Sequence, residues 1–356
     1  MNILFITRKY PPIAGGMEKY SKDLYESISG LARVDLFANR LGNKFLPIFL
    51  AAAAVRIIVT GRRYDIIHFG DGLLAVLIPL VHALGKATVT ITVHGLDVTY
   101  DNPVYQRLVL PRLYAADRIV AISRNTRALC LARGIPEDKI VVIPNGVSLK
   151  VPEGIEPARP TGLPSVSEHS KILCTLGRLV KRKGHEWFVR EVMPLLDRSY
   201  IYLIAGDGPE KQSIEHAITE SGLGNRVILL GRIDETEKEW LFRNASLFIM
   251  PNIPIAGDVE GFGLVLTEAA SRGLMSVASE IDGIPDAVIP GETGVLARPQ
   301  DARSFIRAIE SARPDRDRVA SAVAWFDWKR IARLYLDEMK KAYDGIPARG
   351  LERRRR

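Results

Sequence analysis

Short apolar runs alternate with longer helical patterns along most of the chain. The run 2–7 ends in polar residues and glycines, and a helical pattern with Tyr20, Leu24 and Ile28 spaced by four comes next. Further strand-like runs lie at 33–37, 65–68, 88–93, 118–122, 139–143, 171–176, 201–205, 226–230 and 247–250. This alternation predicts an α/β fold with parallel sheets and crossover helices, in which ligands gather at the carboxyl ends of the strands.

The length of 356 residues predicts two domains. Residues 151–170 are rich in Pro, Gly, Glu and Ser and show no clean periodicity, which is typical of a linker. We therefore expect one domain at 1–155 and another at 156–325, with the ligand cleft at the hinge. An amphipathic helical pattern occupies 326–345, and 346–356 is a basic tail.

Two carboxylates lie in a glycine-bearing segment that follows a buried strand. Glu260 and Glu268 bracket a Gly-Phe-Gly turn and the start of an apolar helix. Free N–H groups at a helix start attract an anion such as phosphate. The spacing puts Glu260 at the loop mouth and Glu268 deeper on the same side. It fits two carboxylates that face a reacting group and a ribose diol, and equally a capped helix whose glutamate suits the helix dipole.

Six other short motifs occur in the order found in one enzyme family. They are Gly15-Gly16, His94-Gly95, Pro144-Asn145-Gly146-Val147, Gly177-Arg178 with Lys183-Gly184, Gly206-Asp207-Gly208-Pro209 and Gly291-Glu292-Thr293-Gly294. Together with Glu260-x7-Glu268 they make nearly the whole chain resemble the retaining nucleotide-sugar glycosyltransferases of group 1, family 4. The resemblance implies the GT-B architecture, with two Rossmann-like domains facing a cleft and a C-terminal helix that crosses back to the first domain.

The resemblance also implies roles for individual residues. Arg178 and Lys183 match the pair that grips the donor diphosphate, and His94 matches a histidine beside the transferred sugar, with a loop-capping histidine as the alternative. The expected catalytic residues are Glu260, His94, Arg178 and Lys183. The expected donor-binding residues are Gly15, Gly16, Arg178, Lys183, Gly231, Arg232, Ile233, Gly261, Phe262, Gly263, Leu264 and Glu268. Lys181 and Arg182 are expected to form a solvated basic loop.

Several classes of protein and site are not expected. Cys130 and Cys174 form no Cys-x-x-Cys pair, which argues against a disulfide framework and a zinc site. Lys211 replaces the third glycine of a dinucleotide fingerprint. No DxD-type acidic pair is evident, so we expect no metal and no cofactor, with the leaving diphosphate stabilised by fixed positive charge. The longest runs without charged residues, 45–55 and 72–85, are shorter than the roughly 20 residues that span a bilayer, and we expect no transmembrane helix.

The positive charge is confined to the first part of the chain. Residues 1–150 hold 19 Lys and Arg against 11 Asp and Glu, a balance of +8, whereas 151–356 hold 30 of each. This asymmetry suits an anionic membrane surface, and an ordinary solvated basic surface is the alternative; we expect no nucleic-acid partner. The apolar segment 45–59, with Arg56 inside it and Arg62 and Arg63 after it, fits either an interfacial helix or a core helix with a basic end.

We therefore expect a retaining glycosyltransferase that moves a hexose-type sugar from a UDP- or GDP-linked donor to a hydroxyl of a lipid-linked or saccharide acceptor, in the synthesis of a bacterial cell-surface glycan. The expected location is the cytoplasm, with peripheral contact to the inner face of the cytoplasmic membrane. Two alternatives stay open: a nucleotide-sugar epimerase or phosphorylase-like enzyme on the same fold, and a non-catalytic nucleotide-sugar-binding protein.

Overall fold

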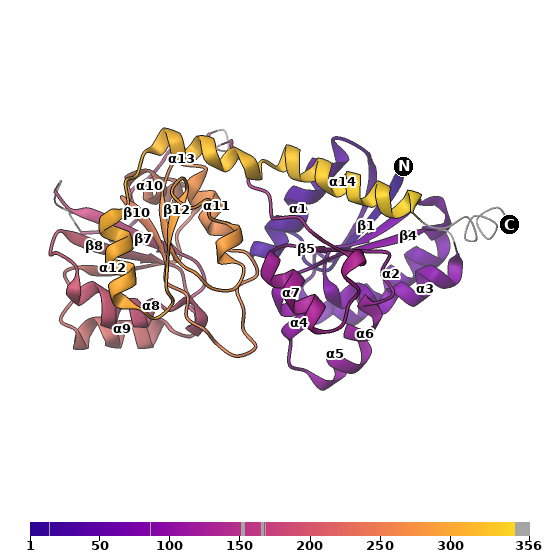
Figure 1. Ribbon diagram of the computed structural model, residues 1–356, viewed down its shortest axis with the longest axis horizontal. Coiled ribbons are helices and arrows are strands. Elements are labelled where there is room, and N and C mark those ends of the chain that lie inside the picture. The colour runs from indigo at the N-terminus through magenta and orange to yellow at the C-terminus, as the bar shows by residue number, and fades with distance from the viewer. Residues whose placement is uncertain (14, 86, 151–153, 165–166, 168, 346–356) are drawn as a thin grey trace. The chain divides into compact units, whose positions relative to one another are not determined.

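The computed structural model describes residues 1–13, 15–85, 87–150, 154–164, 167 and 169–345, which divide into two compact units (Figure 1). The first unit joins Met1–Gly146 to the segment from Phe326 onward, and the second is Val147–Trp325. The first unit therefore ends before the domain boundary expected at 155. The basic tail and parts of the expected linker lie outside the described residues.

The first unit contains a six-stranded parallel sheet in the order β2-β1-β3-β4-β5-β6. Its strands are β1 (Asn2–Thr7), β2 (Arg33–Ala38), β3 (Ile66–Phe69), β4 (Thr88–Val93), β5 (Arg118–Ala121) and β6 (Ile140–Val142). Strands β3 and β4 are buried along their whole length, as expected for parallel strands covered on both faces. The parallel arrangement predicted from the sequence is confirmed.

Helices cover both faces of this sheet (Figure 1). They are α1 (Gly16–Ser29), α2 (Leu46–Thr60), α3 (Ile78–Leu84), α4 (Gly95–Thr99), α5 (Pro103–Leu108), α6 (Leu110–Leu113), α7 (Arg124–Ala132) and α14 (Trp328–Asp344), with short 3-10 segments η1 (Asn43–Phe45), η2 (Gly61–Arg63), η3 (Gly72–Leu77) and η4 (Glu137–Lys139). Although α14 comes from the end of the described chain, it packs beside α1 and against β4 and β5.

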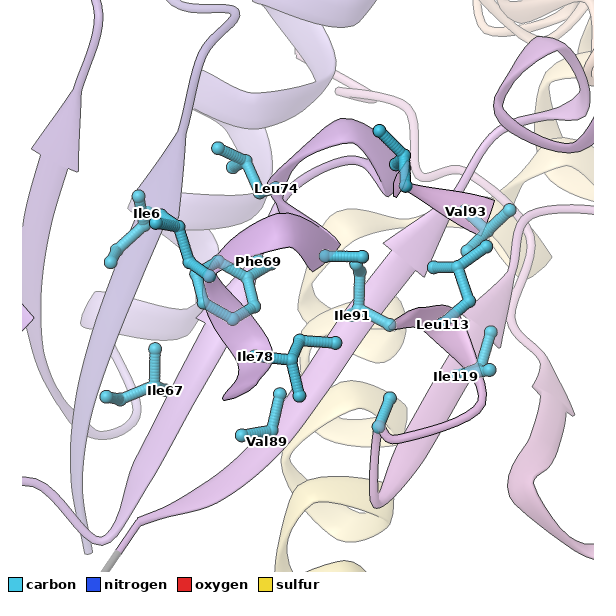
Figure 2. Packing of buried hydrophobic residues seen from close by; sticks show 14 of the residues in the cluster. Ile6, Ile67, Phe69, Leu74, Ile78, Val89, Ile91, Val93, Leu113 and Ile119 are labelled. Atoms are coloured by element: carbon cyan, nitrogen blue, oxygen red, sulfur yellow. The ribbon is translucent and has the colours of Figure 1, made fainter. Parts of the chain in front are cut away.

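The core of the first unit lies between the sheet and the layer of α2, η3, α3 and α6. Figure 2 shows side chains from the strands meeting side chains from this layer. Phe69 and Ile91 of the sheet and Leu74, Ile78 and Leu113 of the layer have no exposed surface. Burying a side chain of this size contributes about 1.5–3 kcal/mol, so this face holds the strand ends in fixed positions.

The second unit repeats the architecture with the order β12-β11-β10-β7-β8-β9, also parallel. The strands are β7 (Lys171–Leu176), β8 (Tyr200–Ala205), β9 (Val227–Gly231), β10 (Leu247–Met250), β11 (Ser276–Ser279) and β12 (Gly294–Ala297). The helical segments are η5 (Lys181–Lys183), α8 (His185–Trp187), η6 (Phe188–Val192), η7 (Met193–Leu195), α9 (Lys211–Glu220), α10 (Glu235–Asn244), α11 (Leu264–Ala270), η8 (Ile284–Asp286), α12 (Ala302–Ser311), α13 (Arg316–Ala322) and η9 (Val323–Phe326).

The segment Asn43–Arg63 forms one continuous helical stretch of 21 residues. By length and composition alone it could cross a membrane, a test that a core helix of a soluble protein also passes; 28% of the apolar window is buried. Phe49, Ala53 and Ile57 face the core, whereas Ile48 and Val59 are 65% and 68% exposed. Charge-free runs did not reveal the length of this helix because Arg56 interrupts them.

Candidate functional site

A cluster of opposite charges lies at the carboxyl end of the second sheet. The Lys183 Nζ is 2.7 Å from the Glu260 Oε2, and the Arg182 Nη2 is 3.5 Å from the same oxygen. The Glu260 and Lys183 side chains are each only 13% exposed. Burial would raise the pKa of Glu260, but Lys183 and Arg182 outweigh it and hold that pKa below its usual value. The carboxylate is therefore ionised and oriented at neutral pH.

Arg182 is part of this cluster, and the expectation that it is solvated is wrong. Its side chain is 21% exposed and lies between Glu260 and Asp258, whose Oδ1 is 3.5 Å from the Arg182 Nη1. Lys181 is exposed, as expected. The sequence could not separate the two residues, because their difference arises from Asp258, which lies far away along the chain.

Gly184 brings the basic loop against the loop that follows β10. It adopts a φ of +65°, and a Cβ there would lie 2.0 Å from the Pro251 carbonyl oxygen. The Ile253 N–H also donates to the Arg182 carbonyl oxygen at 2.9 Å. Only glycine combines this backbone conformation with so close an approach. The close packing of the two loops therefore requires glycine at position 184, whatever the motif's role in binding a ligand.

The Gly-Phe-Gly turn directly follows Glu260, whose backbone is bonded to Asp282. Gly263, at the start of α11, has a φ of +93°, and Phe262 is 2% exposed, so its side chain belongs to the core. The Glu260 N–H donates to the Asp282 Oδ2 at 3.0 Å. Phe262 can thus offer a ligand only its backbone. Leu264 begins α11 and Glu268 lies further along it, both half-buried.

The other predicted donor residues of this unit lie around neighbouring strand ends. Arg178 follows β7 and is exposed; its carbonyl oxygen accepts from the Val180 N–H at 3.0 Å, and no ion pair holds its side chain among the residues that the structure describes. Gly231 ends β9 with a φ of +69°, and its carbonyl oxygen accepts from the Gly206 N–H at 2.7 Å. Arg232 is a surface residue with an 84% exposed side chain that pairs with Asp207, and Ile233 is half-buried.

His94 lies at the carboxyl end of β4 in the first unit, where it precedes α4. It is 8% exposed; its Nε2 lies 3.3 Å from the Gly70 carbonyl oxygen, and its N–H donates to the Asp97 Oδ2 at 2.8 Å. Because a carbonyl oxygen only accepts, Nε2 carries a proton, and the His94 side chain also accepts from the Asp97 backbone N–H in a capping box at the start of α4. Gly15 and Gly16, at the start of α1, are exposed in the same unit.

Sequence reasoning missed a buried polar group next to His94. The Arg8 Nε donates to the Asp71 Oδ1 at 2.7 Å, and the Asp71 side chain has no exposed surface. Asp97 is buried beside them, and burial raises the pKa of its carboxyl. The available signal was positional: Arg8, Asp71 and Asp97 follow the ends of β1, β3 and β4, which are adjacent in the sheet.

Solved structures share this fold over nearly the whole chain. Anabaena HepE in complex with UDP matches with a TM-score of 0.75 at 19% identity, covering 96% of this chain and all of that one. The sucrose-phosphate synthase of Thermosynechococcus elongatus matches with a TM-score of 0.75 at 24% identity, covering 97% of this chain and all of that one. Two Rossmann-like units with these strand-end motifs define a nucleotide-sugar glycosyltransferase of the GT-B architecture.

The family models agree with that class. The model for Glycosyltransferase Family 4 matches residues 13–151, and that for Glycosyl transferases group 1 matches residues 164–322. The chain belongs to this family, the group 1 (family 4) glycosyltransferases. A curated relative, the GDP-mannose-dependent alpha-(1-6)-phosphatidylinositol monomannoside mannosyltransferase of Mycolicibacterium smegmatis, is 26% identical, with 92% of this chain and 93% of the relative covered.

Proposed function

We propose that this glycosyltransferase moves a hexose from a UDP- or GDP-linked donor to a hydroxyl of a lipid-linked or saccharide acceptor, with retention of anomeric configuration, in the synthesis of a bacterial cell-surface glycan. The observation that carries the proposal is the partly buried pairing of Lys183 with Glu260 at a strand end. The mycolicibacterial relative is named for GDP-mannose and a lipid-linked acceptor, and HepE has been solved with UDP-glucose. These names support the two donor classes and the lipid-linked acceptor.

The proposed chemistry uses fixed charge to stabilise the leaving group. The bond from the anomeric carbon to the diphosphate oxygen breaks, and a bond from that carbon to the acceptor oxygen forms on the same face. The acceptor proton passes to the leaving phosphate oxygen. The Arg178 guanidinium would bind two diphosphate oxygens at once, and the Lys183 ammonium would contact another as a point charge. Preorganised positive charge at this place stabilises the transition state.

Glu260 orients both Lys183 and the sugar in this proposal. An ammonium group has three donors, so Lys183 can keep its contact with Glu260 and still meet a phosphate oxygen. The second Glu260 oxygen is then available to a sugar hydroxyl. Glu268 is assigned to the ribose, and the His94 imidazole to a hydroxyl of the transferred sugar. The backbone N–H groups of the Gly261–Leu264 turn would contact the phosphates.

We also propose that the first unit contacts an anionic membrane through α2. The exposed side chains of Ile48, Val55 and Val59 form an apolar stripe opposite the buried one. No acidic residue occurs between Asp35 and Asp65, whereas Arg62 and Arg63 are exposed at the end of the helix. An apolar face with a basic flank suits an acidic lipid surface. Arg56 turns toward the Tyr64 hydroxyl instead, at 3.1 Å.

The test is a panel of nucleotide sugars, with donor turnover and product stereochemistry followed by proton NMR. UDP-glucose and GDP-mannose are offered with and without an extract of bacterial polar lipids and with soluble mannosides. Formation of an axial glycoside from an axially linked donor supports the proposal. An equatorial product overturns retention, conversion of the donor to its epimer without acceptor indicates an epimerase, and tight binding without any turnover indicates a binding protein.

A further inference from the structure

The candidate catalytic histidine, His94, has an aromatic neighbour on α1. The ring of Tyr20, on α1, meets the His94 ring edge-on, with 5.1 Å between centroids and an interplanar angle of 88°. Tyr20 is 1% exposed. The imidazole also contacts the backbone on its other sides, at the Gly70 carbonyl oxygen (3.3 Å) and in the capping box with Asp97. Tyr20 is therefore the aromatic side chain among the contacts that orient the His94 ring.

Tyr20 is in turn fixed by the last helix. Its hydroxyl is hydrogen-bonded to the hydroxyl of Tyr335, from α14, and donates to the Thr92 Oγ1 at 3.3 Å. The Trp328 ring, also from α14, lies 5.8 Å from the Tyr20 ring. Both tyrosines are fully buried, and burial raises the pKa of Tyr335 to about 12, so the hydroxyls keep their protons at neutral pH.

One consistent direction of hydrogen bonds runs through this network. If Tyr20 donates to Thr92, its oxygen is free to accept from Tyr335. The Thr92 hydroxyl can then donate to the His68 Nε2 at 3.3 Å, which leaves the His68 Nδ1 to donate to Thr90 at 2.8 Å. Burial lowers the pKa of His68 to about 3, so this ring is neutral and offers one donor and one acceptor. In this arrangement each of these hydroxyls donates one hydrogen bond, and the Tyr335 oxygen also lies 3.2 Å from the Thr92 Oγ1.

We propose that Tyr20 is a positioning residue for His94, and that Tyr335 of α14 holds Tyr20 in place. The geometry favours this assignment because Tyr20 contacts both the imidazole and the side chains of α14. The inference rests on the role assigned to His94 under the proposed function. Removing the ring would open a cavity beside the imidazole, whereas removing only a hydroxyl would loosen the support and leave the ring in contact.

Three variants separate these effects, and a fourth serves as a matched control. Tyr20→Leu removes the ring, Tyr20→Phe removes its hydroxyl, and Tyr335→Phe removes the partner hydroxyl on α14. The control is Tyr64→Phe: Tyr64 is also buried, and its hydroxyl donates to the Asp35 Oδ2 at 2.6 Å in the same unit. It makes no contact with His94 in the part of the chain that the structure describes.

The first readout is release of nucleoside diphosphate from GDP-mannose or UDP-glucose, measured well below the unfolding temperature of every variant. We expect Tyr20→Leu to lower kcat by about tenfold or more with KM for the donor nearly unchanged, because a small displacement of a reacting group carries a large penalty. Tyr335→Phe and Tyr20→Phe should give smaller losses of kcat. Tyr64→Phe should leave kcat unchanged even if it lowers the unfolding temperature.

The second readout does not depend on activity. The chain has six histidines, and nitrogen-15 labelling with a His94→Gln variant identifies the imidazole signals of His94. We expect these signals to shift in Tyr20→Leu and Tyr335→Phe and to stay in place in Tyr64→Phe. Unmoved signals in Tyr20→Leu overturn the positioning role. If the signals shift but His94→Gln turns over donor like the wild type, the positioning role stands and the function assigned to His94 is wrong.

Discussion

Lys183 and Glu260 form a 2.7 Å ion pair in which both side chains are 13% exposed. The pair joins two loops that are distant in sequence, one after β7 and one after β10. Removing the cation from a partly buried carboxylate lowers the stability of the protein more than removing it from an exposed carboxylate, because the remaining charge is less well solvated. Substitutions at this pair therefore have to be judged by both stability and turnover.

Removing the positive charges assigned to the leaving group should affect chemistry most. Arg178→Ala and Lys183→Ala should each raise the barrier in kcat/KM by about 2–4 kcal/mol, the size of losing one preorganised donor. Lys183→Ala should also lower the unfolding temperature, because Glu260 loses its near partner, whereas the exposed Arg178 should not. Lys181→Ala is the control, since its side chain is solvent-exposed. Wild-type turnover in both variants would contradict the assignment.

The two glutamates should differ in what they bind. Glu268→Ala should weaken the binding of the bare nucleoside diphosphate, because we assign Glu268 to the ribose hydroxyls. Glu260→Ala should leave that affinity nearly unchanged and suppress transfer. Isothermal titration calorimetry with UDP and GDP measures the first effect, and a transfer assay measures the second. Equal losses of nucleotide affinity in both variants would show that the division of roles is mistaken.

Turnover should not need a divalent cation. We expect full activity after dialysis against EDTA, because we assign stabilisation of the leaving diphosphate to the fixed positive charges of Arg178 and Lys183 and not to a metal. The measurement is donor turnover with EDTA alone and after adding back manganese or magnesium. Loss with the chelator and recovery with either cation would refute this account of the leaving group.

Binding to acidic vesicles should depend on Arg62 and Arg63. Each basic residue near an anionic surface contributes about 1 kcal/mol, so the double replacement by Glu should release most of the protein, and high salt should do the same. Arg56→Gln is the control, because this side chain is engaged with Tyr64. Sedimentation with phosphatidylglycerol vesicles measures binding. Retention that ignores salt and charge reversal would indicate apolar insertion of α2.

Two buried histidines should make the protein less stable in mild acid. Burial lowers the pKa of His68 and of His185 to about 3. At a pH below the ordinary histidine pKa but above about 3, these two side chains are therefore protonated in the unfolded chain and neutral in the native protein. The free energy of unfolding should then fall as the pH falls from about 6 to 4, by about 1.4 kcal/mol per pH unit for each histidine.

Urea unfolding at several pH values tests this expectation. His68→Gln and His185→Gln should each reduce the slope of the free energy of unfolding against pH by about 1.4 kcal/mol per pH unit, the contribution of one histidine. His216→Gln is the control, because its side chain is 67% exposed on α9, and its slope should match the wild type. Equal slopes in wild type and both buried variants would mean that neither histidine is held neutral.

The sequence predicted the local elements well and the long-range contacts poorly. Runs of apolar residues located β1 to β10, because a buried parallel strand has a nearly continuous apolar sequence. The strands β11 and β12 were missed: they have four residues each, many of them small. Motifs located Lys183 and Glu260 but not their mutual contact. Arg182 was misjudged, and Arg8 and Asp71 were overlooked, because only the fold brings their partners near.

The place of α14 in the first unit also bears on how the chain is made. Tyr335 and Trp328 complete the surroundings of Tyr20, yet they follow the whole second unit in sequence. A ribosome releases the first 146 residues long before it has made these side chains. The α14-facing side of α1 and β4 in the nascent first unit therefore stays uncovered until translation is nearly finished. The second unit is one continuous segment and can fold as soon as it has been made.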